Sequence, residues 1–211
     1  MTNADRSQVA SRAHVSRRAA LRVLGSVVAL TATHATAADH APNDPPPFGT
    51  ARHQFTTLRP RRLVPAARLV GLDGASTDFA VWRGSVVLLN FWATWCPACR
   101  TELPNLERLH ALSGDDVRVA AISTDREGRA AVLPYVRALG VKKLAIYLDP
   151  DQRLARPADS RRNAPFALYG MPITYVIDRS GRIAGYLAGE ADWTSAAARA
   201  LLDFFRTSPA G

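Results

Sequence analysis

Cysteine is scarce in this chain of 211 residues: it has only two, Cys96 and Cys99, in the stretch 90-NFWATWCPACRTELPNL-106. One such pair supplies two metal ligands, whereas a structural zinc site needs four, and no second C-x-x-C is present. A disulfide across two residues closes so short a loop that it removes little entropy from the unfolded chain. For this cysteine pair, a metal site and a purely structural disulfide are therefore poorer interpretations than a redox centre.

Long runs of basic residues and apolar runs long enough to span a bilayer are also missing from the sequence. The formal net charge is +9, but the first 37 residues hold five Arg and one Asp, which leaves 22 basic and 17 acidic residues in the rest. The sequence has no long Lys/Arg run with interleaved aromatic residues, so we expect no nucleic-acid partner. The N-terminal apolar run, 23-VLGSVVALTAT-33, has about half the length that a bilayer-spanning helix needs.

Residues 1–37 have the three-part form of a secretory signal: an Arg-rich start, the apolar run and small residues at 35-ATA-37. Arg17 and Arg18 indicate twin-arginine export, although Ala20 stands where Phe is common; the alternative is two chance arginines in an ordinary signal. No cysteine lies near the cleavage site, which disfavours a lipid anchor. We expect a cleaved signal and a mature protein in an oxidising compartment, the bacterial periplasm.

The remaining pattern predicts a Pro-rich linker at 38–61 and one compact domain at 62–211. Asp73 and Gly74 favour a hairpin turn. Strands are predicted at 86–92, 117–124 and 144–149, a hairpin at 173–189, and helices at 97–112, 128–139 and 192–206. This order indicates an α/β fold: a central mixed β-sheet flanked by helices on both faces, with an N-terminal β-hairpin extension.

The position of the cysteine pair at a predicted strand–helix junction indicates its chemistry. If a helix begins at Pro97, which suits a first turn, then Cys96 lies at the helix N-terminus, where a thiolate is favoured. Cys96 is therefore the expected nucleophile, and Cys99, one turn further in, the expected resolving cysteine. Trp95 either shapes the surface that a partner meets or simply packs.

The stretch 90-NFWATWCPACRTELPNL-106 resembles the active-site segment of thioredoxin-fold proteins, and 170-GMPITYVIDRSGRI-183 resembles their cis-proline segment. With the export signal, the chain resembles the TlpA/ResA/CcmG (DsbE-like) group of periplasmic thiol–disulfide oxidoreductases over about residues 65–207. The resemblance implies a thioredoxin-like fold and no cofactor beyond the redox-active disulfide. It also implies that Pro172 is cis and that the backbone of Met171 is free to pair with an extended substrate.

Two positions distinguish subgroups within this resemblance. Asn90 stands where thioredoxins proper have a buried Asp, and Glu102 matches a glutamate of the ResA-like proteins. The match implies that Glu102 takes the proton from Cys99; the alternative is a solvated charge near the helix start. Ile173 stands where CcmG-type proteins often have Glu, and the segment 151–170 is longer than usual, either to select a partner or as a tolerated insertion.

The resemblance implies a monomeric, specific reductase, re-reduced by a membrane electron donor of the DsbD or CcdA kind. Its expected partner is an exported protein with a disulfide, an apocytochrome c in cytochrome c-type biogenesis or a copper-assembly protein. The alternatives are a dithiol oxidase and a Sco-like metal-delivery protein. The latter needs a wider cysteine spacing and a downstream His, and no His follows His110.

Overall fold

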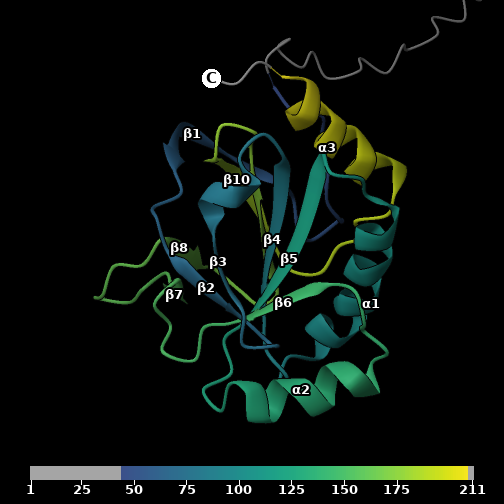
Figure 1. Cartoon of the computed structure of the whole chain (residues 1–211). Coiled ribbons are helices and arrows are strands. Elements are labelled where there is room, and N and C mark those ends of the chain that lie inside the picture. Colours follow the sequence, from purple (N-terminus) through teal and green to yellow (C-terminus); the bar gives the residue numbers. More distant parts are fainter. Residues whose placement is uncertain (1–43, 209–211) are drawn as a thin grey trace, which may run out of the picture. The chain divides into compact units, whose positions relative to one another are not determined.

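The structure, a computed structural model, describes residues 44–208, so the predicted export signal at 1–37 lies outside the described residues (Figure 1). Most strands join one eight-stranded sheet in the order β1-β10-β9-β4-β5-β6-β2-β3, and β7 pairs with β8 separately. No helix within residues 44–208 is long and apolar enough to cross a bilayer. The elements are β1 (Thr56–Leu63), β2 (Arg68–Gly71), β3 (Ser76–Asp78), η1 (Phe79–Trp82), β4 (Val86–Trp92), α1 (Pro97–Leu112), β5 (Val117–Ser123), α2 (Arg129–Ala138), β6 (Ala145–Leu148), β7 (Ala155–Pro157), β8 (Phe166–Leu168), β9 (Ile173–Ile177), β10 (Arg182–Ala188) and α3 (Ala196–Thr207).

Strand β4 is the centre of the sheet and positions the cysteine pair at its carboxyl end. It pairs parallel with β5 and antiparallel with β9, and all of its residues are buried. Because side chains alternate along a strand, Leu88 and Trp92 join one core cluster, while Leu89 and Phe91 join the other. The predicted continuous apolar strand is thus confirmed, with Asn90 as its one buried polar residue.

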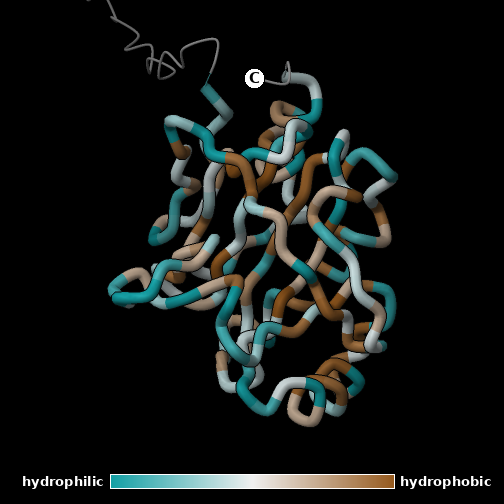
Figure 2. The backbone as a smooth tube through the Cα atoms, turned by 60° about the vertical axis from the view of Figure 1, so that its left-hand side comes forward, coloured by the Kyte–Doolittle hydropathy of each residue, from teal (hydrophilic) through white to brown (hydrophobic). Residues whose placement is uncertain are grey.

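The three α-helices of the described residues pack on one face of the sheet, so the predicted helical cover of the two faces is uneven (Figure 1). Their buried residues belong to the cluster that contains both cysteines. The opposite face is covered by the 3-10 helix η1 and by the segment that carries β7 and β8. Figure 2 shows the hydrophobic stretches concentrated in the inner strands and the hydrophilic ones in the outer loops.

The segment at 151–170 is part of this second cover. The Asp149 carboxylate accepts backbone N–H groups from Arg153, Leu154 and Ala155 at 2.7 to 3.0 Å, which fixes the start of the segment. Leu154 and Phe166 are then buried against the sheet. The long connection therefore completes the core, because no α-helix among residues 44–208 covers this face.

The predicted linker at 38–61 is wrong where the structure describes it. Strand β1 pairs with β10 at the edge of the sheet, and the predicted hairpin, β2–β3, joins the same sheet through β6. Phe48, only 5% exposed, lies 4.7 Å from the ring of Trp193. The packed domain therefore includes residues well before 62, because this stretch buries aromatic side chains despite its prolines.

Candidate redox site

The cysteine pair forms a disulfide at the junction of β4 and α1. Cys96 is the N-cap of α1, and its sulfur accepts the backbone N–H of Cys99 at 3.1 Å. Pro97 occupies the first turn, as predicted, where a missing N–H costs nothing. Both cysteines are buried in this oxidised form, Cys96 at 3% and Cys99 at 1% exposure.

The loop between β4 and the pair is held by Asp125, a residue that sequence reasoning missed. This carboxylate accepts the backbone N–H of Thr94 at 3.0 Å, the Thr94 hydroxyl at 2.6 Å and the Ser123 hydroxyl at 2.8 Å. Asp125 follows β5, the parallel neighbour of β4, so its position just after a buried strand was the available signal. It fixes the approach of the chain to Cys96.

Glu102, on α1 three residues after Cys99, is buried at 2% exposure, which excludes the solvated surface charge that we kept as an alternative. Its Oε1 accepts the N–H of Ala191 and the indole N–H of Trp193, both at 3.1 Å, and its Oε2 accepts from Asn90 at 2.8 Å. Burial raises the pKa of Glu102 from 4.5 to about 7, although these hydrogen bonds favour the carboxylate. A group of this kind exchanges protons near neutral pH.

Asn90 connects Glu102 to the sheet. Its Nδ2 donates both to Glu102 and to the Thr174 hydroxyl, at 2.9 Å for the latter. Its Oδ1 is buried and has no hydrogen-bond partner among residues 44–208. The amide therefore donates to the carboxylate and leaves an acceptor unused inside the core.

The cis-proline segment has the geometry that the resemblance implied. The Met171–Pro172 peptide bond is cis, and the carbonyl of Pro172 accepts the N–H of Gly189 at 2.7 Å. Met171 is half-buried against the core cluster that contains both cysteines. Within the described part of the chain its backbone makes no hydrogen bond, so its N–H and C=O are available.

Exposed side chains flank the buried disulfide. Trp95 is 68% exposed, which decides against its simply packing in the core, and Pro97 is exposed beside it. Tyr169, two residues before the cis bond, is 58% exposed and stacks on Tyr186 at 4.9 Å. Trp95, the neighbour of Cys96 in the chain, thus presents aromatic surface to solvent.

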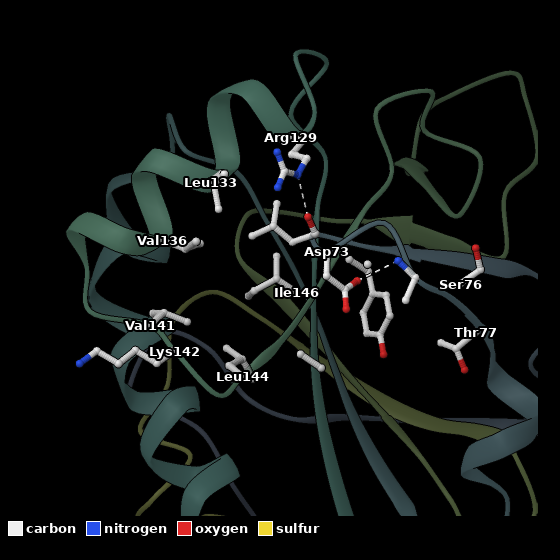
Figure 3. Close-up of a pocket in the computed structure, with 15 residues that line it drawn as sticks. Asp73, Ser76, Thr77, Arg129, Leu133, Val136, Val141, Lys142, Leu144 and Ile146 are labelled. Carbon is white, nitrogen blue, oxygen red and sulfur yellow. Dashed lines mark hydrogen bonds between the residues drawn. The ribbon is translucent and has the colours of Figure 1, made fainter.

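Two cavities differ in whether a predicted site residue lines them. One of about 330 Å³ reaches Glu102 itself, between α1 and the turn at 190–192. Another, of about 460 Å³, lies between α2 and the β2–β3 hairpin, and no predicted site residue lines it (Figure 3). In it, Arg129 donates to the carbonyl of Leu72, and Asp73 accepts the N–H of Ala75, so these charged groups serve the local backbone.

Trp193 is a second site residue that the sequence did not reveal. It lies 91 positions from Glu102 along the chain, and only the packing of the segment before α3 on α1 brings them together. Its backbone N–H donates to Asn105 on α1 at 3.0 Å. The available signal was weak: an aromatic residue just before the last predicted helix.

Comparison with known proteins agrees with this geometry. The AhpC/TSA family matches residues 60–186. The chain is 34% identical over 130 residues to the thiol:disulfide interchange protein DsbE of Yersinia pestis, covering 60% of this chain and 63% of that one. It is 30% identical over 128 residues to the thiol:disulfide interchange protein HelX of Rhodobacter capsulatus, covering 59% and 65%. The match thus spans just under two thirds of these relatives.

The fold has solved counterparts. The structure of a putative thiol:disulfide interchange protein DsbE from Chlorobium tepidum superposes with a TM-score of 0.55. The alignment covers 71% of this chain and 99% of that one, at 24% identity. This likeness establishes the thioredoxin-like α/β fold.

Proposed function

Because the chain belongs to the AhpC/TSA family, we propose that it is a thiol–disulfide oxidoreductase that reduces partner disulfides with Cys96 and Cys99. The observation that carries this proposal is the placement of the pair, with Cys96 capping α1. The relatives are thiol:disulfide interchange proteins, which supports the same activity. Both electrons reside on sulfur, so the reaction needs no further cofactor.

The first step is attack by Cys96. In the reduced protein, the free N–H groups and dipole at the start of α1 favour the Cys96 thiolate. The thiolate attacks one sulfur of the partner disulfide, so a Cys96–partner bond forms and the partner S–S bond breaks. The released partner sulfur leaves as a thiolate and takes a proton from water.

The second step is resolution by Cys99. The Cys99 thiol gives its proton to the Glu102 carboxylate, and the resulting thiolate attacks the Cys96 sulfur. The Cys96–Cys99 bond forms, the mixed disulfide breaks, and the second partner sulfur leaves as a thiolate that takes a proton from water. The partner has then gained two electrons and two protons. The burial of Glu102 and its pKa of about 7 support this role, because a base is most useful when its pKa lies near the working pH.

The substrate is proposed to bind as an extended segment beside Pro172. The unpaired backbone of Met171 suits strand addition, and the exposed side chains of Trp95 and Pro97 supply contact surface next to Cys96. We propose that these four residues recognise the partner, with the segment at 151–170 supporting the sheet from the opposite face.

The cellular setting is part of the proposal. We propose that the protein acts in the periplasm as a monomer, is re-reduced by a membrane dithiol donor of the DsbD or CcdA kind, and serves apocytochrome c or a copper-site assembly protein. The export-signal pattern at 1–37 and the DsbE and HelX relatives support this setting.

The test is the equilibrium potential of the Cys96–Cys99 couple, measured against glutathione or dithiothreitol with tryptophan fluorescence as readout. A potential below about −220 mV, toward the thioredoxin end of the scale, is expected for a reductase. A value near about −120 mV would reverse the direction and make the protein a dithiol oxidase. A pair that exchanges with neither reagent would contradict the proposed activity, and Cys96→Ala is the matched control.

A further inference from the structure

The hydrogen-bond partners of the Glu102 carboxyl group within residues 44–208 are all donors. Within residues 44–208 its carboxyl group receives three hydrogen bonds, from Asn90, the backbone of Ala191 and the indole of Trp193. Asn90 belongs to the strand that carries the cysteine pair, and Ala191 contributes only its backbone. Trp193 is therefore the one side chain from outside the β4–α1 unit that bonds directly to this carboxyl group.

We propose that Trp193 is a positioning residue for the redox reaction: its indole N–H holds Glu102 Oε1 and stabilises the carboxylate that accepts the proton of Cys99. This inference rests on the proposed function, since it assigns a role within the resolution step. The bond length of 3.1 Å and the complete burial of Trp193 carry it, because a charged acceptor removed from water depends strongly on its remaining donors.

Trp193 is itself held in place by its backbone and by its ring. The backbone N–H of Trp193 donates to Asn105 Oδ1, and Asn105 Nδ2 donates to Asp192 at 2.7 Å, which ties the segment before α3 to α1. On the other side the ring of Phe48 lies at 4.7 Å, tilted by 48°. The stretch that precedes β1 thus supports the residue that orients Glu102.

Other charged groups also face Glu102, and each has a defined place. The cavity that reaches Glu102 is lined by Arg108 from α1 and by Glu190 and Asp192 from the turn, and the charge of Glu190 raises the pKa of Glu102. Hydrogen bonds from Thr194 and Asn105 lower the pKa of Asp192.

Three further titratable groups complete the surroundings. The ring of His53 lies against Gly189, the residue before Glu190. The other two groups are Cys96 and Cys99, at the start of α1. Replacing Trp193 removes none of these groups, so a change in pH dependence reports the indole N–H.

The same cavity gives the proton a way out. When Glu102 has taken the proton of Cys99, the carboxylic acid must return it to water before the next cycle. Glu102 lines the cavity together with the polar side chains of Thr50 and Thr101, so this return does not have to pass the disulfide. Because the indole N–H of Trp193 bonds Oε1 and stabilises the carboxylate, it sets how readily Glu102 gives this proton back to water.

The experiment compares Trp193→Phe with Trp82→Phe. Both changes replace an indole by a phenyl ring, but Trp82 packs on Phe79 and Tyr147, away from Glu102. Reduced protein is mixed with oxidised glutathione, and release of the second glutathione by Cys99 is followed by stopped flow from pH 5 to 9. The wild-type resolution rate should rise with a midpoint near about 7.

Loss of the indole N–H should move this midpoint alkaline by about 1 pH unit and slow resolution at pH 7 roughly fivefold. Trp82→Phe should overlay the wild type. An unchanged midpoint in Trp193→Phe, or an equal shift in Trp82→Phe, would overturn the inference. A wild type that does not react with oxidised glutathione would count against the proposed function itself.

A second measurement applies if Trp193→Phe does not fold. In wild-type protein with ¹⁵N-labelled indoles, the Trp193 N–H resonance, assigned by its contacts with Phe48, should shift with a midpoint near about 7. In Glu102→Gln the same resonance should be independent of pH. A pH-independent resonance in the wild type would overturn the inference.

Discussion

Replacing Glu102 by Gln should change how the stability of the oxidised protein depends on pH. Burial raises the pKa of Glu102 from 4.5 to about 7, against the opposing hydrogen bonds from Ala191, Trp193 and Asn90. The folded protein therefore holds this proton more tightly than the unfolded chain does, and its stability falls as pH rises from about 4.5 to about 7. A difference of about 2.5 pH units corresponds to a loss of about 3 kcal/mol.

Gln is neutral at every pH, so the variant should not show this decline. At pH 5 we expect a free energy of unfolding close to that of the wild type, and at pH 8 a value higher by up to about 3 kcal/mol. The new amide places a donor opposite Asn90 Nδ2, but Asn90 can turn its unpartnered Oδ1 toward it. Because Nδ2 donates to both Glu102 and Thr174, the Thr174 hydroxyl then faces Oδ1 and donates to it.

The assay is urea unfolding of oxidised wild type and variant between pH 5 and 8. Glu107→Gln, on the same helix, is the matched control with the opposite sign. Desolvation raises the pKa of Glu107, but N–H groups of Leu144, Lys143 and Lys142 outweigh it and lower the pKa overall. That control should therefore lose stability at neutral pH and match the wild type at low pH. Parallel curves for Glu102→Gln and wild type would refute the reasoning.

Four further variants test other parts of the structure. Cys96→Ala should abolish reduction of a partner disulfide, whereas Cys99→Ala should trap a mixed disulfide visible on a non-reducing gel; normal turnover by the latter would exclude the two-cysteine scheme. Asp125→Ala leaves buried donors of the active-site loop unpaired, so urea unfolding should show a loss of about 1–3 kcal/mol, against no loss if water replaces the carboxylate. Gly189→Ala, at φ +107° with its Cβ 2.5 Å from the His53 ring, should cost at least about 1 kcal/mol, and adding His53→Ala should restore only the part due to contact.

The alternation and spacing of residues predicted the central part of this fold well, and its edges poorly. Strand β4 and helix α1 follow from a continuous apolar run and from leucines at helical spacing. Strand β1, 56-TTLRPRRL-63, carries Pro60 and three arginines and shows no alternation, because an edge strand has one unpaired side that tolerates proline and charge. Its assignment needed its partner β10, which only the folded chain reveals.

The candidate site was also predicted only in part from the sequence. Cys96, Cys99 and Glu102 lie within seven residues of one helix start, so spacing alone placed them together. The groups that give Glu102 its properties, Trp193 and the N–H of Ala191, come from the far end of the chain and meet it only after the sheet has formed. Local sequence therefore brings together the residues that we propose to react, whereas the proton affinity of Glu102 depends on tertiary contacts.

The pairing of Asn90 with Glu102 explains why this site is built around a single acid. Their side chains lie 2.8 Å apart in the core, so a carboxyl group at both positions would place two like charges in contact, and the pair would hold a shared proton to still higher pH. An amide at position 90 instead supplies a donor that lowers the proton affinity of Glu102, partly offsetting the effect of burial. A buried acid on α1 can therefore still ionise near neutral pH, provided that position 90 stays uncharged.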